Sequence, residues 1–245
     1  MKGSVMKSIT HLLATDLDDT LVGLKPELKE LTDMFNRIPQ QVSLVYVTGR
    51  HAESVKQLMT EENLPMPDLV ISDVGTKIWH MPDWIEDTDW CDKVTADWRP
   101  DLIKKAAARF PKLVPQRLPD DRRISFTIQN DQKTVHQFEQ ILIQRQLPHR
   151  LIYSSNLNVD VLPLHAGKGN AVEYVLTHYY DSTVNVLVAG DSENDLDMLN
   201  RGWPSVVVGN AQPGLSVLPE TPYLFKAERH CAGGIYDAWQ HFYGN

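Results

Sequence analysis

Two carboxylates two positions apart follow an apolar run near the start of the chain. Residues 12–14 are apolar, and Asp16 and Asp18 come shortly after them. Residues two apart share one face of a strand, so both carboxylates can converge just past its C-terminal end. Hard cations such as Mg²⁺ take oxygen ligands, and a carboxylate can attack phosphorus to form an acyl phosphate. The pair therefore indicates metal-assisted phosphoryl chemistry, although an acidic turn after a buried strand has the same pattern.

Three later segments carry further polar groups at strand ends or helix starts. The apolar residues 42–47 are followed by Thr48 and Gly49, which offer a hydroxyl and free amides at a helix N-terminus, where phosphate binds well. Lys168 opens another helical stretch. The apolar residues 184–189 precede a second acidic cluster, which includes Asp191, Asn194 and Asp195. Together these segments favour one composite phosphate and metal site.

The order of these groups carries a family resemblance. Asp-x-Asp, Thr, Lys and then Gly-Asp-x-x-x-Asp resembles the four motifs of the haloacid dehalogenase (HAD) phosphatases, in the family's order. Shorter blocks are similar to those of the sucrose-phosphate phosphatases, namely residues 74–78, 124–126, 154–155, 159–163 and 209–213. Phosphatases that act on mannosyl or glucosyl glycosides share enough of these blocks to remain alternatives.

The resemblance implies a role for each core residue. Asp16 would attack phosphorus and form an aspartyl phosphate, which splits hydrolysis into two easier displacements. Asp18 would protonate the leaving sugar oxygen and then activate water. Thr48, Gly49 and Lys168 would bind the phosphoryl oxygens, and the charge of Lys168 would keep Asp16 ionised.

A magnesium site follows from the same resemblance. Its expected ligands are Asp16, the main-chain carbonyl of Asp18, Asp191 and Asp195. Asn194 would orient Asp191 or Lys168 by a hydrogen bond, and it is also expected among the substrate-binding residues. Three further acidic residues are expected to be solvated charges at helix starts, namely Asp19, Glu193 and Asp197.

The leaving sugar would be recognised by the middle of the chain. Arg123, Asn156 and Asn158, together with Arg122, could donate hydrogen bonds to sugar hydroxyls. Four tryptophans could stack on a sugar ring, namely Trp79, Trp84, Trp90 and Trp98. Aromatic side chains more often pack in a core than bind a ligand, so we expect fewer than half of these eight residues to touch the sugar.

The hydrophobic periodicity predicts a doubly wound α/β core. Residues 9 to about 77 alternate apolar strands with helical segments, which is typical of right-handed βαβ units around a parallel sheet. The alternation returns after residue 159. The predicted strands are 12–15, 42–47, 69–71, 184–189 and 205–208, and the predicted helices are 26–37, 52–60, 168–179, 194–200 and 233–243.

The middle of the chain has a different rhythm. Helical patterns over 101–110 and 134–145 flank an alternating strand at 123–129, and 152–154 adds another strand. We therefore predict a Rossmann-like HAD core with an inserted smaller α/β cap, as in the family's large-cap branch. The predicted division is residues 1–79 and 159–245 for the core and 80–158 for the cap.

Composition limits the remaining possibilities. A chain of 245 residues with 42% hydrophobic content can bury a substantial core. The formal net charge of −8 argues against a nucleic-acid partner, and no apolar run is long enough for a membrane span. Cys91 and Cys231 alone give neither a disulfide framework nor a zinc spacing. We expect a cytoplasmic monomer whose partner is a small sugar phosphate.

The predicted function is Mg²⁺-dependent hydrolysis of a glycosyl phosphate, with sucrose 6-phosphate as the first choice. Mannosyl-3-phosphoglycerate, mannosylfructose phosphate and glucosylglycerate phosphate are the alternative substrates. A non-catalytic sugar-phosphate sensor is the alternative of a different class. The presence of Asp18 argues against it, because a protein that only binds has no need of a general acid.

Overall fold

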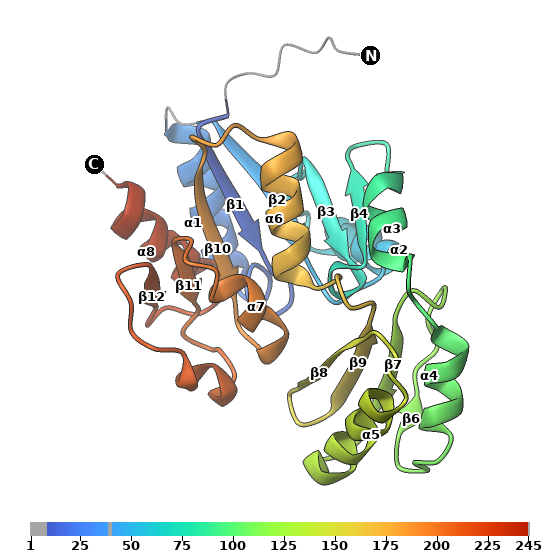
Figure 1. The fold of residues 1–245 in the computed structure, drawn as a ribbon. Helices are drawn as coiled ribbons and strands as arrows, with labels where there is room; N and C mark the ends of the chain where they lie inside the picture. The colour runs from blue at the N-terminus through green and yellow to red at the C-terminus, as the bar shows by residue number, and fades with distance from the viewer. Residues whose placement is uncertain (1–8, 39–40, 245) are drawn as a thin grey trace.

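The computed structural model describes residues 9–38 and 41–244, which form a large sheet and a small one, each with its own helices (Figure 1). The large sheet has the order β12-β11-β10-β1-β2-β3-β4-β5 and is parallel from β12 to β3. The two strands at its other edge are antiparallel. Its strands are β1 (His11–Thr15), β2 (Val42–Val47), β3 (Leu69–Ser72), β4 (Lys77–His80), β5 (Ile85–Glu86), β10 (Asn185–Gly190), β11 (Ser205–Val207) and β12 (Leu224–Lys226).

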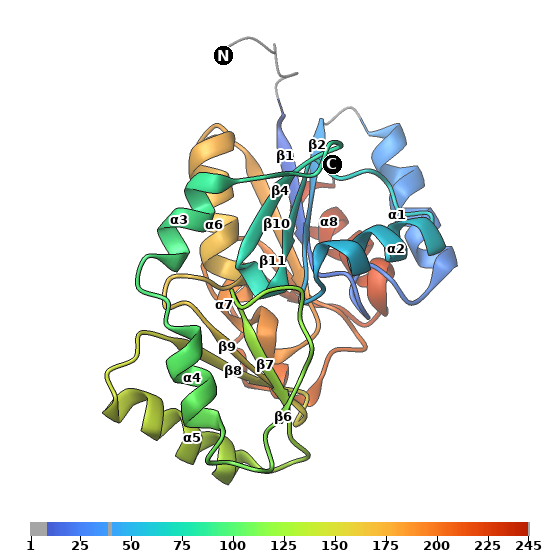
Figure 2. The ribbon, with the colours of Figure 1, turned by 90° about the vertical axis from the view of Figure 1, so that its right-hand side faces the viewer.

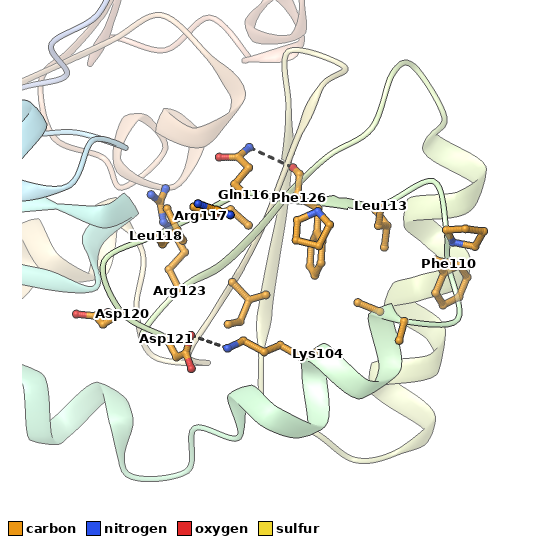
Figure 3. Close-up of a pocket in the computed structure, with 16 residues that line it drawn as sticks. Lys104, Phe110, Leu113, Gln116, Arg117, Leu118, Asp120, Asp121, Arg123 and Phe126 are labelled. Carbon is orange, nitrogen blue, oxygen red and sulfur yellow. Dashed lines mark hydrogen bonds and ion pairs between the residues drawn. The ribbon is translucent and has the colours of Figure 1, made fainter.

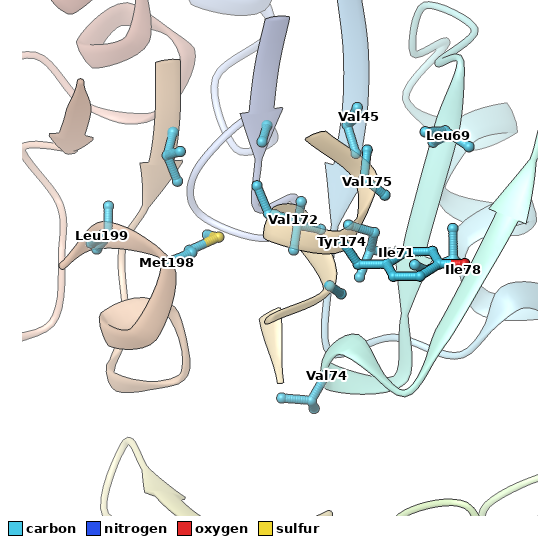
Figure 4. Packing of buried hydrophobic residues seen from close by; sticks show 14 of the residues in the cluster. Val45, Leu69, Ile71, Val74, Ile78, Val172, Tyr174, Val175, Met198 and Leu199 are labelled. Atoms are coloured by element: carbon cyan, nitrogen blue, oxygen red, sulfur yellow. The ribbon is translucent and has the colours of Figure 1, made fainter. Parts of the chain in front are cut away.

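Helices cover both faces of the large sheet, so its central strands bury apolar side chains on both faces. In β1, Leu12 and Ala14 belong to one hydrophobic cluster, whereas Leu13 belongs to the cluster on the opposite face. Figure 4 shows the first cluster, where Val172 of helix α6 lies near the strands. This face is covered by α3 (Thr88–Thr95), α6 (Lys168–Tyr179) and α7 (Leu196–Leu199), and the other by α1 (Lys25–Arg37), α2 (Ala52–Glu61) and α8 (Cys231–Tyr243).

The small sheet is antiparallel and has the order β6-β7-β9-β8. It packs against its two helices around a separate hydrophobic cluster that includes Phe126 and Phe138 (Figure 2). We call this unit the cap. Its elements are α4 (Pro100–Ala107), β6 (Val114–Pro115), β7 (Ile124–Thr127), α5 (Gln132–Gln144), β8 (Arg150–Ser154) and β9 (Asn158–Leu162).

The predicted domain boundaries do not coincide with these two units. β5 joins the large sheet, and Trp90 and Val94 of α3 pack in the large unit's core. β9 pairs with β7 and β8, so the cap continues to Leu162. Sequence rhythm does not separate the two units at these points, because an antiparallel edge strand and a cap strand have the same periodicity. We propose that the cap comprises residues 98–162 instead of 80–158.

The individual elements agree well with the predicted ones. The helix predicted over 168–179 is α6, and the strands predicted after residues 42 and 184 are β2 and β10. The helix predicted over 194–200 is a 3-10 turn, Glu193–Asp195, followed by the single turn α7. Two further 3-10 turns span Asp73–Gly75 and Pro213–Val217. No helix within the described ranges has the length and apolarity that crossing a bilayer requires.

Candidate active site

The predicted catalytic residues meet at the carboxyl ends of β1, β2 and β10. The chain continues from β1 to β2 on one side, while β10 lies on the other, so these ends form the switch point where open α/β sheets bind ligands. A cleft of about 320 Å³ opens there between the core and the cap. Asp16, Asp18, Thr48, Gly49 and Asp191 line it.

Lys168 is a buried positive charge between two carboxylates of the site. Its side chain is fully buried, and its Nζ donates at 2.6 Å to Asp16 Oδ1 and at 2.6 Å to Asp195 Oδ1. Burial lowers the pKa of Lys168, but the two carboxylates outweigh this effect and raise it above its ordinary value. Burial raises the pKa of Asp16, an effect that Lys168 opposes and Asp195 reinforces. Because the ammonium group contacts two carboxylates, we treat Lys168 as charged. One ammonium cannot neutralise both carboxylates, so Asp16 is the group that needs a further cation.

The loop that carries Lys168 is held by a close backbone contact. Gly75 and Gly167 both have positive φ, at 85° and 125°. A Cβ on Gly75 would lie 2.3 Å from the carbonyl group of Gly167, so this approach requires glycine. The contact connects the end of β3 to the start of α6 and thereby fixes where Lys168 enters the site.

Three carboxylates form a possible metal site. Oxygen atoms of Asp16, Asp191 and Asp195 lie within 4.8 Å of one another. Burial, reinforced by Asp195, raises the pKa of Asp191 to about 7. Asp195 is the most engaged of the three, because its Oδ2 also accepts from the amides of Asp191 (3.0 Å) and Ser192 (3.1 Å). Three buried carboxylates beside one lysine leave excess negative charge, so the donor set fits a hard divalent cation such as Mg²⁺.

Asn194 does not hold the position that we predicted. It lines the cleft, but its Oδ1 is buried and accepts no hydrogen bond among the described residues. The amide therefore orients neither Asp191 nor Lys168 in this structure. Asp191 instead accepts from the hydroxyl of Thr20 at 3.2 Å. Asn194 stays a predicted substrate-binding residue, because it lines the cleft with an amide oxygen that no described residue contacts by a hydrogen bond.

Thr48 is buried at the end of β2 and is tied into the core by its backbone. Its amide donates to Ile71 O at 2.8 Å, and its carbonyl accepts from Val74 at 3.0 Å. Its hydroxyl oxygen accepts from the amide of Arg50 at 3.1 Å. The hydroxyl hydrogen remains available for a phosphoryl oxygen in the cleft.

Asp18 has a partner that sequence reasoning missed. Arg50 donates from Nε and Nη2 to the two oxygens of Asp18, each at 2.7 Å. Both side chains line the cleft, and Asp18 is 49% exposed. Arg50 follows Thr48-Gly49 directly, and no spacing rule indicates that its side chain turns toward Asp18.

Two of the four polar residues predicted to bind the sugar reach the cleft. Arg123 and Asn158 line it, whereas Asn156 lies in the turn between β8 and β9, outside the lining. Arg123 is held at 3.4 Å by Asp160 and at 3.8 Å by Asp73, and its buried Nε has no hydrogen-bond partner among the described residues. Gln116 and Ser155 also line the cleft and had not been predicted.

The four tryptophans and Arg122 serve the structure instead. None of them is among the cleft-lining residues in the described part of the chain. The indole N–H groups of Trp79, Trp90 and Trp98 donate to Ser72, Gly75 and Asp121. Trp84 packs edge-on against Trp79, and Arg122 pairs with Glu86 and Asp120. The four indole rings lie outside this cleft, so we do not assign them to sugar binding.

Of the three acidic residues predicted as solvated charges, one is largely buried and a second is half-buried against the cap. Asp197 is largely buried, accepts from the amide of Gly169 at 3.0 Å and pairs with Arg150 of the cap at 2.9 Å. Glu193 accepts from the amide of Ser155, also in the cap, at 3.0 Å. Both residues connect the cap to core loops beside the site, whereas Asp19 is exposed as predicted.

A second, larger hollow lies wholly within the cap. It measures about 680 Å³ and lies beside α4, β6 and β7 (Figure 3). Its lining is mostly apolar, with Leu113 and Phe126 among its walls, and it shares only Gln116 and Arg123 with the cleft. None of the predicted catalytic or metal-binding carboxylates lines it, so we place the chemistry in the smaller cleft.

Comparison with known proteins gives a consistent result. Residues 9–243 match the family model described as sucrose-6F-phosphate phosphohydrolase. A sucrose-phosphatase from Synechocystis sp. PCC6803, solved in complex with sucrose and phosphate, superposes with a TM-score of 0.88 at 30% identity. The superposition covers 95% of this chain and 98% of that one.

Two curated relatives extend the comparison. A probable sucrose-phosphatase 2 from Arabidopsis thaliana is 32% identical over 250 residues, which cover 94% of this chain and 59% of that protein. A glucosylglycerol-phosphate synthase from Pseudomonas anguilliseptica is 35% identical over 235 residues, which cover 94% of this chain and 30% of that protein. The chain thus spans about three fifths and about a third of these relatives.

Proposed function

Because the chain belongs to the sucrose-6F-phosphate phosphohydrolase family of HAD phosphoric monoester hydrolases, we propose that it hydrolyses a glycosyl phosphate with the help of Mg²⁺. The observation that carries this proposal is the buried Lys168 between Asp16 and Asp195. These groups lie beside Asp191 at the carboxyl ends of the parallel strands. A phosphate dianion needs a fixed cation and a poised carboxylate at the same point, and both are present.

The nucleophile is Asp16 in this proposal. Its carboxylate attacks phosphorus as the bond to the sugar oxygen breaks, and water later releases phosphate from the resulting aspartyl phosphate. Asp18 donates a proton to the departing sugar oxygen and later accepts one from the attacking water. Thr48 and Lys168 hold the phosphoryl oxygens during both steps.

The metal would be held by Asp16, Asp191, Asp195 and the carbonyl group of Asp18. When bound, Mg²⁺ supplies positive charge that offsets repulsion between these carboxylates and the phosphoryl oxygens. The raised pKa of Asp191 supports this assignment, because burial of that carboxylate without a cation disfavours its charged form.

The first candidate substrate is sucrose 6-phosphate. Sucrose and phosphate are bound in the Synechocystis structure, which has nearly the same length and fold as this chain. The cap side of the cleft presents planar polar groups, Arg123, Gln116 and Asn158, that suit sugar hydroxyls.

A glucosylglycerol phosphate is the second candidate. The Pseudomonas relative named for glucosylglycerol-phosphate synthesis is slightly more identical to this chain than the Arabidopsis sucrose-phosphatase is. Both substrates present a glycosyl group on a phosphate monoester, so the core residues would treat them alike.

A phosphate-release panel with purified protein and Mg²⁺ tests the proposal. The panel compares sucrose 6-phosphate, glucosylglycerol phosphate, mannosyl-3-phosphoglycerate and glucose 6-phosphate. We expect the highest kcat/KM with one of the glycoside phosphates. Phosphate release from none of them, despite measurable binding, would instead support a sugar-phosphate sensor.

We also propose that the protein is a cytoplasmic monomer. Cys91 and Cys231 are both free, which suits a reducing compartment. Light scattering at several concentrations tests the oligomeric state, and a mass that rises with concentration would contradict it.

A further inference from the structure

The arginine that follows the Thr48-Gly49 segment is anchored on three sides. Its Nε and Nη2 donate to the two oxygens of Asp18 at 2.7 Å, and its Nη1 donates to Ser54 Oγ at 2.8 Å in the first turn of α2. Its backbone amide donates to the Thr48 hydroxyl oxygen at 3.1 Å. Arg50 therefore connects the phosphate-binding end of β2 to the side chain of Asp18.

This contact is the main restraint on the Asp18 side chain. Asp18 is 49% exposed, and its carboxylate has no other hydrogen-bond partner among the described residues. A guanidinium that donates two parallel hydrogen bonds fixes the plane of a carboxylate, which a single point charge cannot do. Each carboxylate oxygen has two acceptor sites, so the pairing leaves one site per oxygen for another partner.

We propose that Arg50 is a positioning residue, which holds the carboxyl group of Asp18 in the orientation that proton transfer to the leaving sugar oxygen requires. The inference rests on the proposed function, because it assigns a purpose to Arg50 only if Asp18 is the general acid. In the step concerned, Asp16 forms a bond to phosphorus as the bond from phosphorus to the sugar oxygen breaks, and the proton moves from Asp18 to that oxygen. Water then bonds to phosphorus as the bond from phosphorus to Asp16 breaks, and the water gives a proton to Asp18.

The test compares two leaving groups. A sugar alkoxide needs a proton as it departs, whereas 4-nitrophenolate leaves readily without one. Arg50→Lys keeps the positive charge but loses the two parallel hydrogen bonds. We expect it to lower kcat on sucrose 6-phosphate, or on glucosylglycerol phosphate if the panel selects it, by about tenfold or more. We expect kcat on 4-nitrophenyl phosphate to fall by less than about threefold, with KM nearly unchanged.

Two controls accompany this variant. Arg37→Lys alters an arginine that is 79% exposed and whose one ion pair with a described residue is with Asp33, at 3.9 Å, so it should change neither activity. Arg50→Gln is a second variant, checked by its melting temperature, in case Arg50→Lys folds poorly. Asp18→Asn should show the same split between leaving groups, and adding Arg50→Lys to it should cost little more, because both act through one proton transfer.

Four outcomes would overturn the inference. Equal losses on both substrates would indicate a general structural effect, and a raised KM with kcat retained would make Arg50 a phosphate-binding residue. If Asp18→Asn gives the split and Arg50→Lys does not, only the role of Arg50 is wrong. If Asp18→Asn gives no split, the general-acid assignment fails, and the role of Arg50 fails with it. The panel with the unmodified protein decides separately whether the chain is a phosphatase.

Discussion

The core wall and the cap wall of the cleft are built differently. On the core side, Lys168 is fully buried and contacts two carboxylates at 2.6 Å, and one of them, Asp195, also accepts from two backbone amides. On the cap side, Arg123 has longer contacts, at 3.4 and 3.8 Å, and a nitrogen that no described residue contacts by a hydrogen bond. The core is thus preorganised for one invariant group, the phosphoryl group, whereas the cap keeps hydrogen-bonding capacity for a variable one.

The two sheets differ in the same sense. β1 is apolar on both faces because helices cover both. In the cap, helices cover one face, so Phe126 and Val159 point into the cap core while the residues next to them, Ser125 and Asp160, hydrogen-bond on the other face. A sheet with one uncovered face can present polar side chains to a ligand, and Asp160 does line the cleft. The difference indicates that chemistry resides in the core and selectivity in the cap.

Removing the nucleophile should have the largest effect. Asp16→Asn replaces a carboxylate by a near-isosteric amide, so we expect activity on every substrate to fall by more than about a thousandfold with the fold retained. Phosphate release and circular dichroism measure this, with mass spectrometry to exclude deamidation. Asp19→Asn is the matched control, because Asp19 lines the same cleft but has no assigned role. Retention of more than about a thousandth of the activity would contradict the role of Asp16.

Metal removal should abolish the reaction at the core residues without changing the cap. EDTA should abolish phosphate release, because Asp16, Asp191 and Asp195 would then repel the phosphate dianion, and Mg²⁺ should restore it. Ca²⁺ should inhibit, because it prefers a looser and higher coordination. Assays at fixed ionic strength measure this. Full activity in the chelator would be incompatible with the proposed mechanism.

Cap substitutions should change selectivity more than catalysis. Asn158→Ala and Arg123→Lys remove cleft-lining groups, so we expect each to reduce the preference for a glycoside phosphate over 4-nitrophenyl phosphate by roughly tenfold. Ratios of kcat/KM measure the preference. Asn156→Ala is the control, since that side chain lies outside the lining. Equal losses on both substrates, or the same change for Asn156→Ala, would mean that other residues recognise the sugar.

The smallest expected effect concerns pH. Burial raises the pKa of Asp191 from 3.8 to about 7, so the metal-free folded state holds this proton more tightly than the unfolded state does. The contribution of Asp191 to the free energy of unfolding is present below the pKa of this carboxyl group in the unfolded state, and it is lost as pH rises towards 7. Bound Mg²⁺ compensates the charge, so the melting temperature with Mg²⁺ minus that with EDTA should grow by about 2–8 °C from pH 5 to pH 7.5.

The same pH series on Asp191→Asn provides the control. This variant carries no titrating carboxyl group at position 191, so the temperature difference should depend much less on pH. A difference that is equally large at both pH values in the unmodified protein would contradict the assignment of Asp191 to the metal site.

Local sequence was sufficient for the parts of the site that depend on one segment. Asp16 and Asp18 follow an apolar strand, Thr48 follows another, and Lys168 begins a helix, and each lies where its own segment predicts. Strand ends in a parallel sheet meet at one edge, so the motifs could be placed together without a structure.

The remaining contacts depend on tertiary structure. The pairing of Arg50 with Asp18 spans 32 residues, and Asp197 reaches both Gly169 and the cap residue Arg150. The predicted boundary at residue 79 lies within β4, which pairs with the neighbouring β5, whereas the place of α3 depends on the distant contacts of Trp90 and Val94 in the large unit's core. Periodicity determines which face of an element is buried. The direction in which a polar side chain turns, and the partner that it meets, depend on how distant elements pack, so only the folded structure decided them.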